Sequence, residues 1–192
     1  MGVDLATARR GDAQMPFNSL VALYEEAARL TGDDAFGLRL GQESDHTKYD
    51  LLGYIVANSH TYGDALEHLV RYVQVWTSAV HFSLTSEGGE AHLAYIYGAG
   101  AVRAELRRQE SEHMLSTMLH IGRQLTGIRW KPSAVCFEHA QPTSVVALLS
   151  EPQPERIVAG QARSLFIQGD EAIERYLRVA APHGREIDAR SG

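Results

Sequence analysis

The feature that most constrains the fold is a change of sequence periodicity near residue 78. Upstream of it, apolar residues recur every three to four positions in "PFNSLVALYEEAARLTG", "YDLLGYIVANS" and "TYGDALEHLVRYVQVW". Downstream, "AVHFSLTS" and "AHLAYIYG" alternate, with "EGGE" between them. A 3.6-residue period predicts helices, and a two-residue period interrupted by glycines predicts a β-hairpin. We therefore expect a helical part over 15–76, followed by a hairpin that turns at Gly88 and Gly89.

A two-residue turn fixes the register that we expect for this hairpin. One face then carries Val80, Phe82, Leu84, Leu93, Tyr95 and Tyr97. The other face carries His81, Ser83, Thr85, His92, Ala94 and Ile96. The first set is more apolar, so it is the predicted core face.

The rest of the chain predicts one long helix and two further strands. "VRAELRRQESEHMLSTMLHIGRQLTG" has helical spacing, with a buried stripe that includes Met114, Leu115, Met118 and Leu125. "SAVCFEHA" is the third predicted strand, and a proline-containing connection leads to a fourth, "SLFIQ". "YDLLGYIVANS" is apolar almost all round, which predicts a buried helix.

These elements predict an α+β fold in a single domain over 1–192. Its helical N-terminal half precedes a small antiparallel sheet in β-β-α-β-β order, with one long helix packed on the sheet. The sheet and long helix occupy 79–168, and a C-terminal helix and tail occupy 170–192.

The two helical runs that flank "NSHT" have the outline of a helix-turn-helix. Thr61 and Asp64 form a capping pattern at the start of the second helix. A DNA-reading helix exposes basic or amide side chains near its start, whereas this one begins with Asp64 and Glu67. The chain also has a net charge of −6, although phosphate-binding domains are usually basic. We therefore interpret the pair as a packed scaffold.

The sequence contains no G-x-S-x-G, H-E-x-x-H, Walker A or C-x-x-C motif. We therefore predict no enzyme activity, no cofactor and no metal. Two metal hypotheses were weighed against this prediction. His113 and His120 lie seven residues apart, too far along a helix to share one ion. His81 and His92, joined by Cys136 and Glu138, are residue types that zinc accepts, but a half-exposed polar sheet face is the favoured interpretation.

A small-molecule pocket is the more plausible site, because pockets combine an apolar lining with a few polar groups. Aromatic side chains from the hairpin region and polar ones from the long helix offer this mixture. The candidate ligand-binding residues are Trp76, Tyr95, Tyr97, Gln109 and His113. Core packing with polar tips that reach water explains the same residues equally well.

Composition limits the cellular setting. The chain is 44% hydrophobic and has one cysteine, Cys136, which suits a reducing compartment and a buried apolar role. No apolar run approaches the ~20 residues that span a bilayer, and the first residues contain no apolar signal segment. We expect a cytoplasmic protein with no membrane contact.

Four stretches in this order resemble the arabinose-binding-like N-terminal effector domain of AraC/XylS-type transcription regulators. They are "LYEEAARLTGDDAFGLRLGQ", "LLGYIVANSHTYGDALEHLVRYVQ", "LTGIRWKPSAVCFEHAQP" and "AGQARSLFIQGD". The resemblance implies a domain that senses a small-molecule effector and forms homodimers. DNA would be bound only through a C-terminal helix-turn-helix domain, which we expect to lie outside this sequence.

Two alternatives remain beside this reading. The chain could be an interaction module that dimerises without a ligand. The order of its elements also resembles the haem nitric-oxide-binding fold, for which His68 or His81 would be the axial ligand.

Overall fold

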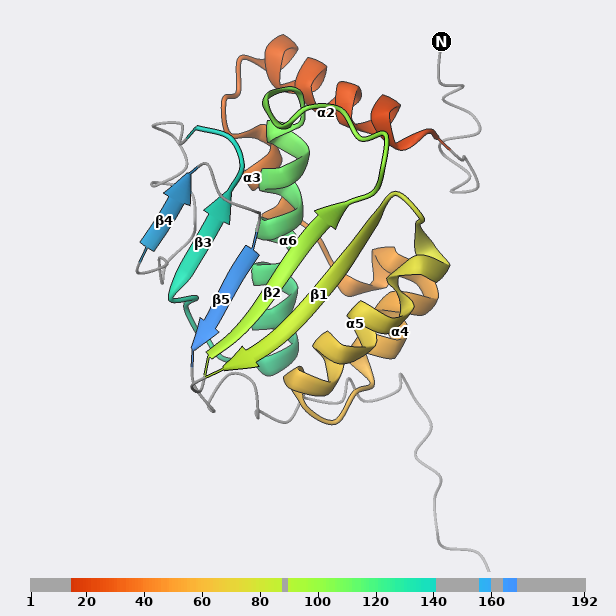
Figure 1. Cartoon of the computed structure of the whole chain (residues 1–192), viewed down its shortest axis with the longest axis vertical. Helices are drawn as coiled ribbons and strands as arrows, with labels where there is room; N and C mark the ends of the chain where they lie inside the picture. The colour runs from red at the N-terminus through yellow and green to blue at the C-terminus, as the bar shows by residue number, and fades with distance from the viewer. Residues whose placement is uncertain (1–14, 88–89, 141–155, 160–163, 169–192) are drawn as a thin grey trace, which may run out of the picture.

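A computed structural model of the protein describes residues 15–87, 90–140, 156–159 and 164–168. The helical half and the sheet follow one another along the chain as expected, so the α+β prediction is confirmed (Figure 1). The helices are α2 (Phe17–Thr31), α3 (Phe36–Gln42), η1 (His46–Tyr49), α4 (Asp50–Ala57), α5 (Tyr62–Trp76), η2 (Ala104–Leu106) and α6 (Arg108–Thr126). The strands are β1 (Val80–Glu87), β2 (Glu90–Tyr97), β3 (Ala134–Phe137), β4 (Arg156–Ala159) and β5 (Ser164–Gln168). The predicted C-terminal helix lies outside the described residues.

The strands form one sheet in the order β1-β2-β5-β3-β4. The β1–β2, β2–β5 and β3–β5 pairs are antiparallel, while β3 and β4 are parallel. β4 was not expected, because its four residues lie inside the proline-containing connection, where no strand was predicted. A four-residue segment is too short for periodicity to distinguish from a loop, and the sheet therefore has one more strand and one more pairing mode than predicted.

The hairpin has the predicted register. Val80 pairs with Tyr97, Phe82 with Tyr95, and Leu84 with Leu93. The predicted core face is the buried one: Val80, Phe82, Leu93 and Tyr95 are each at most 5% exposed. α6 covers this face from behind the sheet (Figure 1).

Two glycines set the distance between α3 and α6. A Cβ atom added to Gly37 would lie 2.0 Å from the carbonyl oxygen of Gln109, and one added to Gly41 would lie 2.6 Å from that of His113. The backbones are thus in direct contact, and Ser116 Oγ donates a hydrogen bond to the Leu38 carbonyl at 2.8 Å. As a result, the first half of α6 is buried on its polar side as well as on its predicted apolar stripe.

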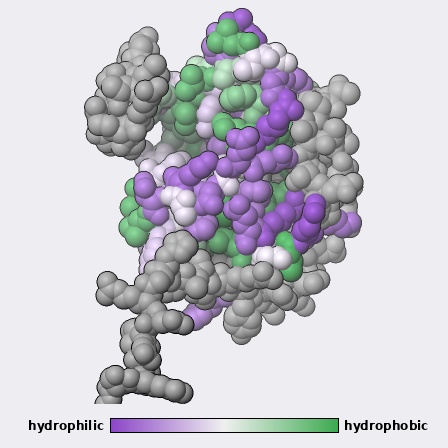
Figure 2. Space-filling view, turned by 180° about the vertical axis from the view of Figure 1, so that it is seen from behind, coloured by the Kyte–Doolittle hydropathy of each residue, from purple (hydrophilic) through white to green (hydrophobic). Residues whose placement is uncertain are grey.

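α4 and α5 form the helix pair that resembles a helix-turn-helix. α5 begins with the predicted capping box, in which Thr61 and Asp64 each bond the other's backbone N–H. The prediction that α4 is buried all round is wrong, because Leu51 is 60% and Tyr54 67% exposed. α4 packs against α5 and η1, and its outer face meets solvent. Seen from behind, hydrophilic residues cover the middle of the molecule, and most of the hydrophobic residues on this face lie above them (Figure 2).

Candidate ligand pocket

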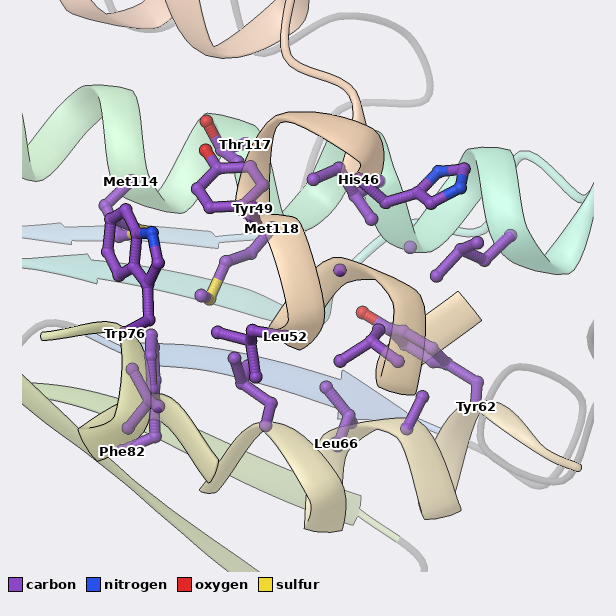
Figure 3. Close-up of a pocket in the computed structure, with 18 of the residues that line it drawn as sticks. His46, Tyr49, Leu52, Tyr62, Leu66, Trp76, Phe82, Met114, Thr117 and Met118 are labelled. Carbon is purple, nitrogen blue, oxygen red and sulfur yellow. The ribbon is translucent and has the colours of Figure 1, made fainter. Parts of the chain in front are cut away.

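A cavity of about 80 Å³ lies between α5 and α6, and it is open to the surface. η1 and α4 form a third wall, and β1 contributes the residues at one end (Figure 3). The lining residues are His46, Tyr49, Leu52, Gly53, Val56, Tyr62, Ala65, Leu66, Leu69, Val73, Trp76, Val80, Phe82, Met114, Thr117, Met118, Ile121, Gly122 and Leu125. None of them is Asp, Glu, Lys or Arg, so the wall carries no formal charge apart from any on His46.

The lining of the pocket extends along the whole of α5. Its α5 wall extends from Tyr62 to Trp76, the whole length of a 15-residue helix, which corresponds to about 21 Å at 1.5 Å per residue. Tyr62 closes one end and is 3% exposed, while Trp76 at the other end is 42% exposed. Figure 3 shows these two side chains at opposite ends of the pocket. Trp76 is thus the most exposed of the lining residues, and its ring packs edge-on against Tyr49 at 5.4 Å.

The few polar groups of the lining are mostly satisfied within the protein. Thr117 Oγ1 donates a hydrogen bond to Ser44 Oγ at 3.1 Å. Burial raises the pKa of Tyr49, while hydrogen bonds with Ser44 and Thr117 act in the opposite direction. Burial also raises the pKa of Tyr62. His46 Nδ1 lies 3.6 Å from a carboxylate oxygen of Asp45 but has no hydrogen-bond partner among the described residues.

Of the five predicted ligand-binding residues, only Trp76 lines this pocket. Tyr95 and Tyr97 lie on the core face of β2 and donate hydrogen bonds to the carboxylate of Glu110, at 2.7 Å in the case of Tyr95. Tyr97 also contacts Ser111 at 3.0 Å. Both hydroxyls thus tie β2 to the start of α6.

Gln109 and His113 lie on the side of α6 that faces α2 and α3. Gln109 accepts a hydrogen bond from the Gly37 N–H at 2.7 Å and donates one to the Asp34 carbonyl at 3.0 Å. The ring of His113 packs against Tyr24 at 5.1 Å. Burial lowers the pKa of His113 to about 4, so the ring is neutral near pH 7. The structure therefore brings four of the five residues into internal contacts and one to the pocket.

A buried polar cluster surrounds the start of α6. Arg107 pairs with Glu138 at 2.5 Å and lies 4.1 Å from the centre of the Tyr97 ring. Arg108 pairs with Asp34 and Glu112, both at 2.9 Å. Glu112 is 0% exposed, and its burial raises the pKa to about 7 despite Arg108. These contacts connect the start of α6 to the helical layer through Asp34 and to the segment after β3 through Glu138.

The histidines of the metal and haem hypotheses are dispersed. Within the residues that the structure describes, no three His, Cys, Asp or Glu side chains are grouped to hold a metal ion. Cys136 is buried, as expected for an apolar role. His68 contacts Ser59 Oγ at 2.8 Å, and His81 lies on the opposite sheet face from the core. Neither lines the pocket, so the two haem ligands named from the sequence do not face it.

The residues that sequence reasoning missed are those of the α5 stripe. Tyr62, Ala65, Leu66, Leu69 and Val73 follow helical spacing. This spacing indicated a buried face, but it did not indicate that the space opposite that face is incompletely filled. No helix within the described ranges is long and apolar enough to cross a membrane.

Comparison with known proteins gives a consistent result. The chain is 26% identical over 149 residues to the ornithine utilization regulator of Pseudomonas aeruginosa, an alignment that covers 73% of this chain and 44% of that protein. The crystal structure of the transcriptional regulator CdpR from the same species has the same fold, with a TM-score of 0.64 at 15% identity. That match covers 94% of this chain and 59% of CdpR. The chain thus spans about half the length of the regulators that it matches.

The family comparison covers most of the chain. The model described as the arabinose-binding domain of AraC transcription regulators, N-terminal, matches residues 1–167. The sequence resemblance, the fold and the relatives agree with this match. The chain therefore belongs to the family of N-terminal arabinose-binding domains of AraC-type transcription regulators.

Proposed function

We propose that this domain senses a small-molecule effector in the pocket between α5 and α6. The observation that carries the proposal is the pocket itself, because its lining extends from the exposed Trp76 to the buried Tyr62 between the two helices. Apolar pockets of this kind, set between helices, are common small-molecule sites. Membership of a regulator family supports a sensing role rather than a catalytic one.

In this proposal the effector alters the packing of α5 against α6. β1 follows α5 directly, and α6 carries the contacts that reach β2, α2 and α3. A ligand between the helices can therefore shift the relative positions of the helical layer and the sheet. The domain acts as a cytoplasmic homodimer and controls DNA binding by a helix-turn-helix domain outside these 192 residues.

A thermal-shift screen of small metabolites tests the sensing role. A ligand that binds only the folded state at 100 times its dissociation constant adds about 2.7 kcal/mol of stability. We expect at least one stabilising compound, and Leu69→Phe, which places a larger side chain in the pocket, should abolish its effect. A stabiliser that acts equally on both proteins would place sensing elsewhere in the domain.

Ligand-independent dimerisation is the second candidate function. Leu51 and Tyr54 on α4 and Val75 on α5 are 60–73% exposed, and grouped exposed apolar side chains often mark protein contacts. Sedimentation equilibrium with and without a stabilising compound separates the two functions. A dimer that forms equally with and without the compound would favour the second candidate, and so would a stable dimer if the screen gives no stabiliser.

A further inference from the structure

We propose that the effector is a molecule with a single unbranched alkyl chain, which lies between α5 and α6 with its polar end at Trp76. This inference rests on the proposed sensing function and names the chemical class of the ligand. It differs from what the family description and the ornithine-related relative would suggest, since a pentose and an amino acid are both strongly polar.

The shape of the pocket selects a chain rather than a ring. An enclosed apolar cavity that binds benzene has a volume of about 150 Å³. Here about 80 Å³ is distributed along a wall as long as the 15-residue helix α5. Averaged over that length, the free space is narrow, which suits an extended hydrocarbon and disfavours a compact or branched ligand.

The chemistry of the lining excludes a highly polar ligand from the interior. The wall offers Tyr49, Tyr62, Thr117 and His46 as polar side chains, and the Thr117 hydroxyl is already bonded to Ser44. A sugar or a zwitterion would lose most of its hydrogen bonds to water on entry, and each polar group left without a partner would weaken its binding. An alkyl chain loses none and gains from leaving water.

The two ends of the pocket set the orientation of the chain. Tyr62 is 3% exposed and closes the inner end, whereas Trp76 is 42% exposed. A polar head group beside Trp76 remains in water, so the protein needs no charged partner for it. Met114 and Met118 line the α6 wall, and flexible methionine side chains adapt to chains of different length.

Binding of a homologous series tests the proposal. Straight-chain 1-alkanols and alkanoic acids of six to sixteen carbons are titrated into the full chain below their aggregation concentrations. The readout is the fluorescence of Trp76 and Trp130, the two tryptophans of the sequence, with calorimetry as a second measurement. Trp76 lines the pocket, and Trp130 packs 5.6 Å from the ring of Tyr62, another lining residue. Affinity should increase about fourfold per methylene group and then level off when the pocket is full.

Pocket-filling variants locate the binding. Leu69→Phe and Val56→Phe add bulk from the α5 wall and the α4 wall, and each should weaken binding of the best alkanol at least tenfold. Leu51→Phe adds similar bulk on the exposed outer side of α4 and should leave binding unchanged. Circular dichroism and thermal unfolding verify that each variant folds.

The polar alternatives are tested with L-arabinose and L-ornithine in the same assay. If either binds and both filling variants abolish its binding, the alkyl-chain proposal is wrong while the sensing function stands. Both proposals fail if no ligand is found among L-arabinose, L-ornithine, the alkyl series and the screened metabolites. Similar affinities for acid and alcohol of equal length support a head group in water, and a large difference contradicts that orientation.

Discussion

Glu112 offers a quantitative test of how the polar cluster on α6 contributes to stability. Its side chain is fully buried, with one oxygen 2.9 Å from Arg108 Nε and 3.5 Å from His139 Nε2. Within the described part of the chain its second carboxylate oxygen has no hydrogen-bond partner. Burial raises the pKa from 4.5 to about 7 in the folded state, so folding favours the protonated carboxyl.

The direction of the pH dependence follows from linkage. Between pH 4.5 and 7 the folded protein holds a proton on Glu112 that the unfolded chain has released. Its contribution to stability is therefore fully present below pH 4.5 and is lost as pH rises through about 7. At 1.36 kcal/mol per pKa unit, the full difference is about 3 kcal/mol.

Glu112→Gln removes this titration and keeps the shape of the side chain. Unfolding free energies from urea titrations at pH 5, 6, 7 and 8 should show the variant gaining about 2–3 kcal/mol relative to the wild type from pH 5 to pH 8. Glu67→Gln changes an exposed carboxylate on α5 and serves as the control, whose difference from the wild type should stay nearly constant. If the Glu112→Gln and wild-type curves run parallel, the carboxyl does not titrate in this range and the reasoning is refuted.

Three further perturbations test other contacts. Burial lowers the pKa of His113 from 6.5 to about 4, so the wild type loses stability as pH falls through this range. His113→Phe cannot titrate, so its unfolding free energy in urea titrations should rise relative to that of the wild type by up to about 3 kcal/mol from pH 7 to pH 4. Thr61→Ala removes the hydroxyl that accepts the Asp64 N–H in the α5 capping box and should lower the unfolding free energy by about 1 kcal/mol. Thr31→Ala is the comparison, because it makes the same substitution at the last residue of α2 and not at an N-cap. Gly37→Ala places a Cβ atom 2.0 Å from a backbone oxygen of α6 and should lower the melting temperature by more than 10 °C, as expected for several kcal/mol. Gly32→Ala meets no neighbouring atom and should lose only the ~1 kcal/mol of a left-handed residue; equal losses at the two glycines would contradict the close α3–α6 contact.

The hairpin shows what local patterns can predict. Its alternation and its two central glycines were sufficient to give the register of β1 against β2, because a slip by one residue would expose Phe82 and Leu93. The capping box of α5 was equally visible, since the interaction is formed by residues three positions apart.

The site was harder to predict because it depends on how elements far apart in the sequence meet. Gln109 and His113 were expected at a pocket, yet the glycines of α3 let that helix approach α6 closely enough to bury them. The apolar stripe of α5 was recognised as a core face, but its spacing contains no information on how completely α6 fills the space opposite. β4 was missed because it pairs with β3, which lies before the connection that contains β4, so the sequence around β4 does not indicate the pairing.

The most direct test of the effector pocket uses the four methionines of the sequence. Met114 and Met118 line the pocket, whereas Met15, at the start of the described chain, does not. In a methyl-¹³C-methionine sample titrated with a stabilising compound or a medium-chain alkanol, we predict that the Met114 and Met118 signals shift together in a saturable way while the Met15 signal stays in place. A saturable ligand that leaves both pocket methyl signals unchanged would contradict the assignment of the effector site to the space between α5 and α6.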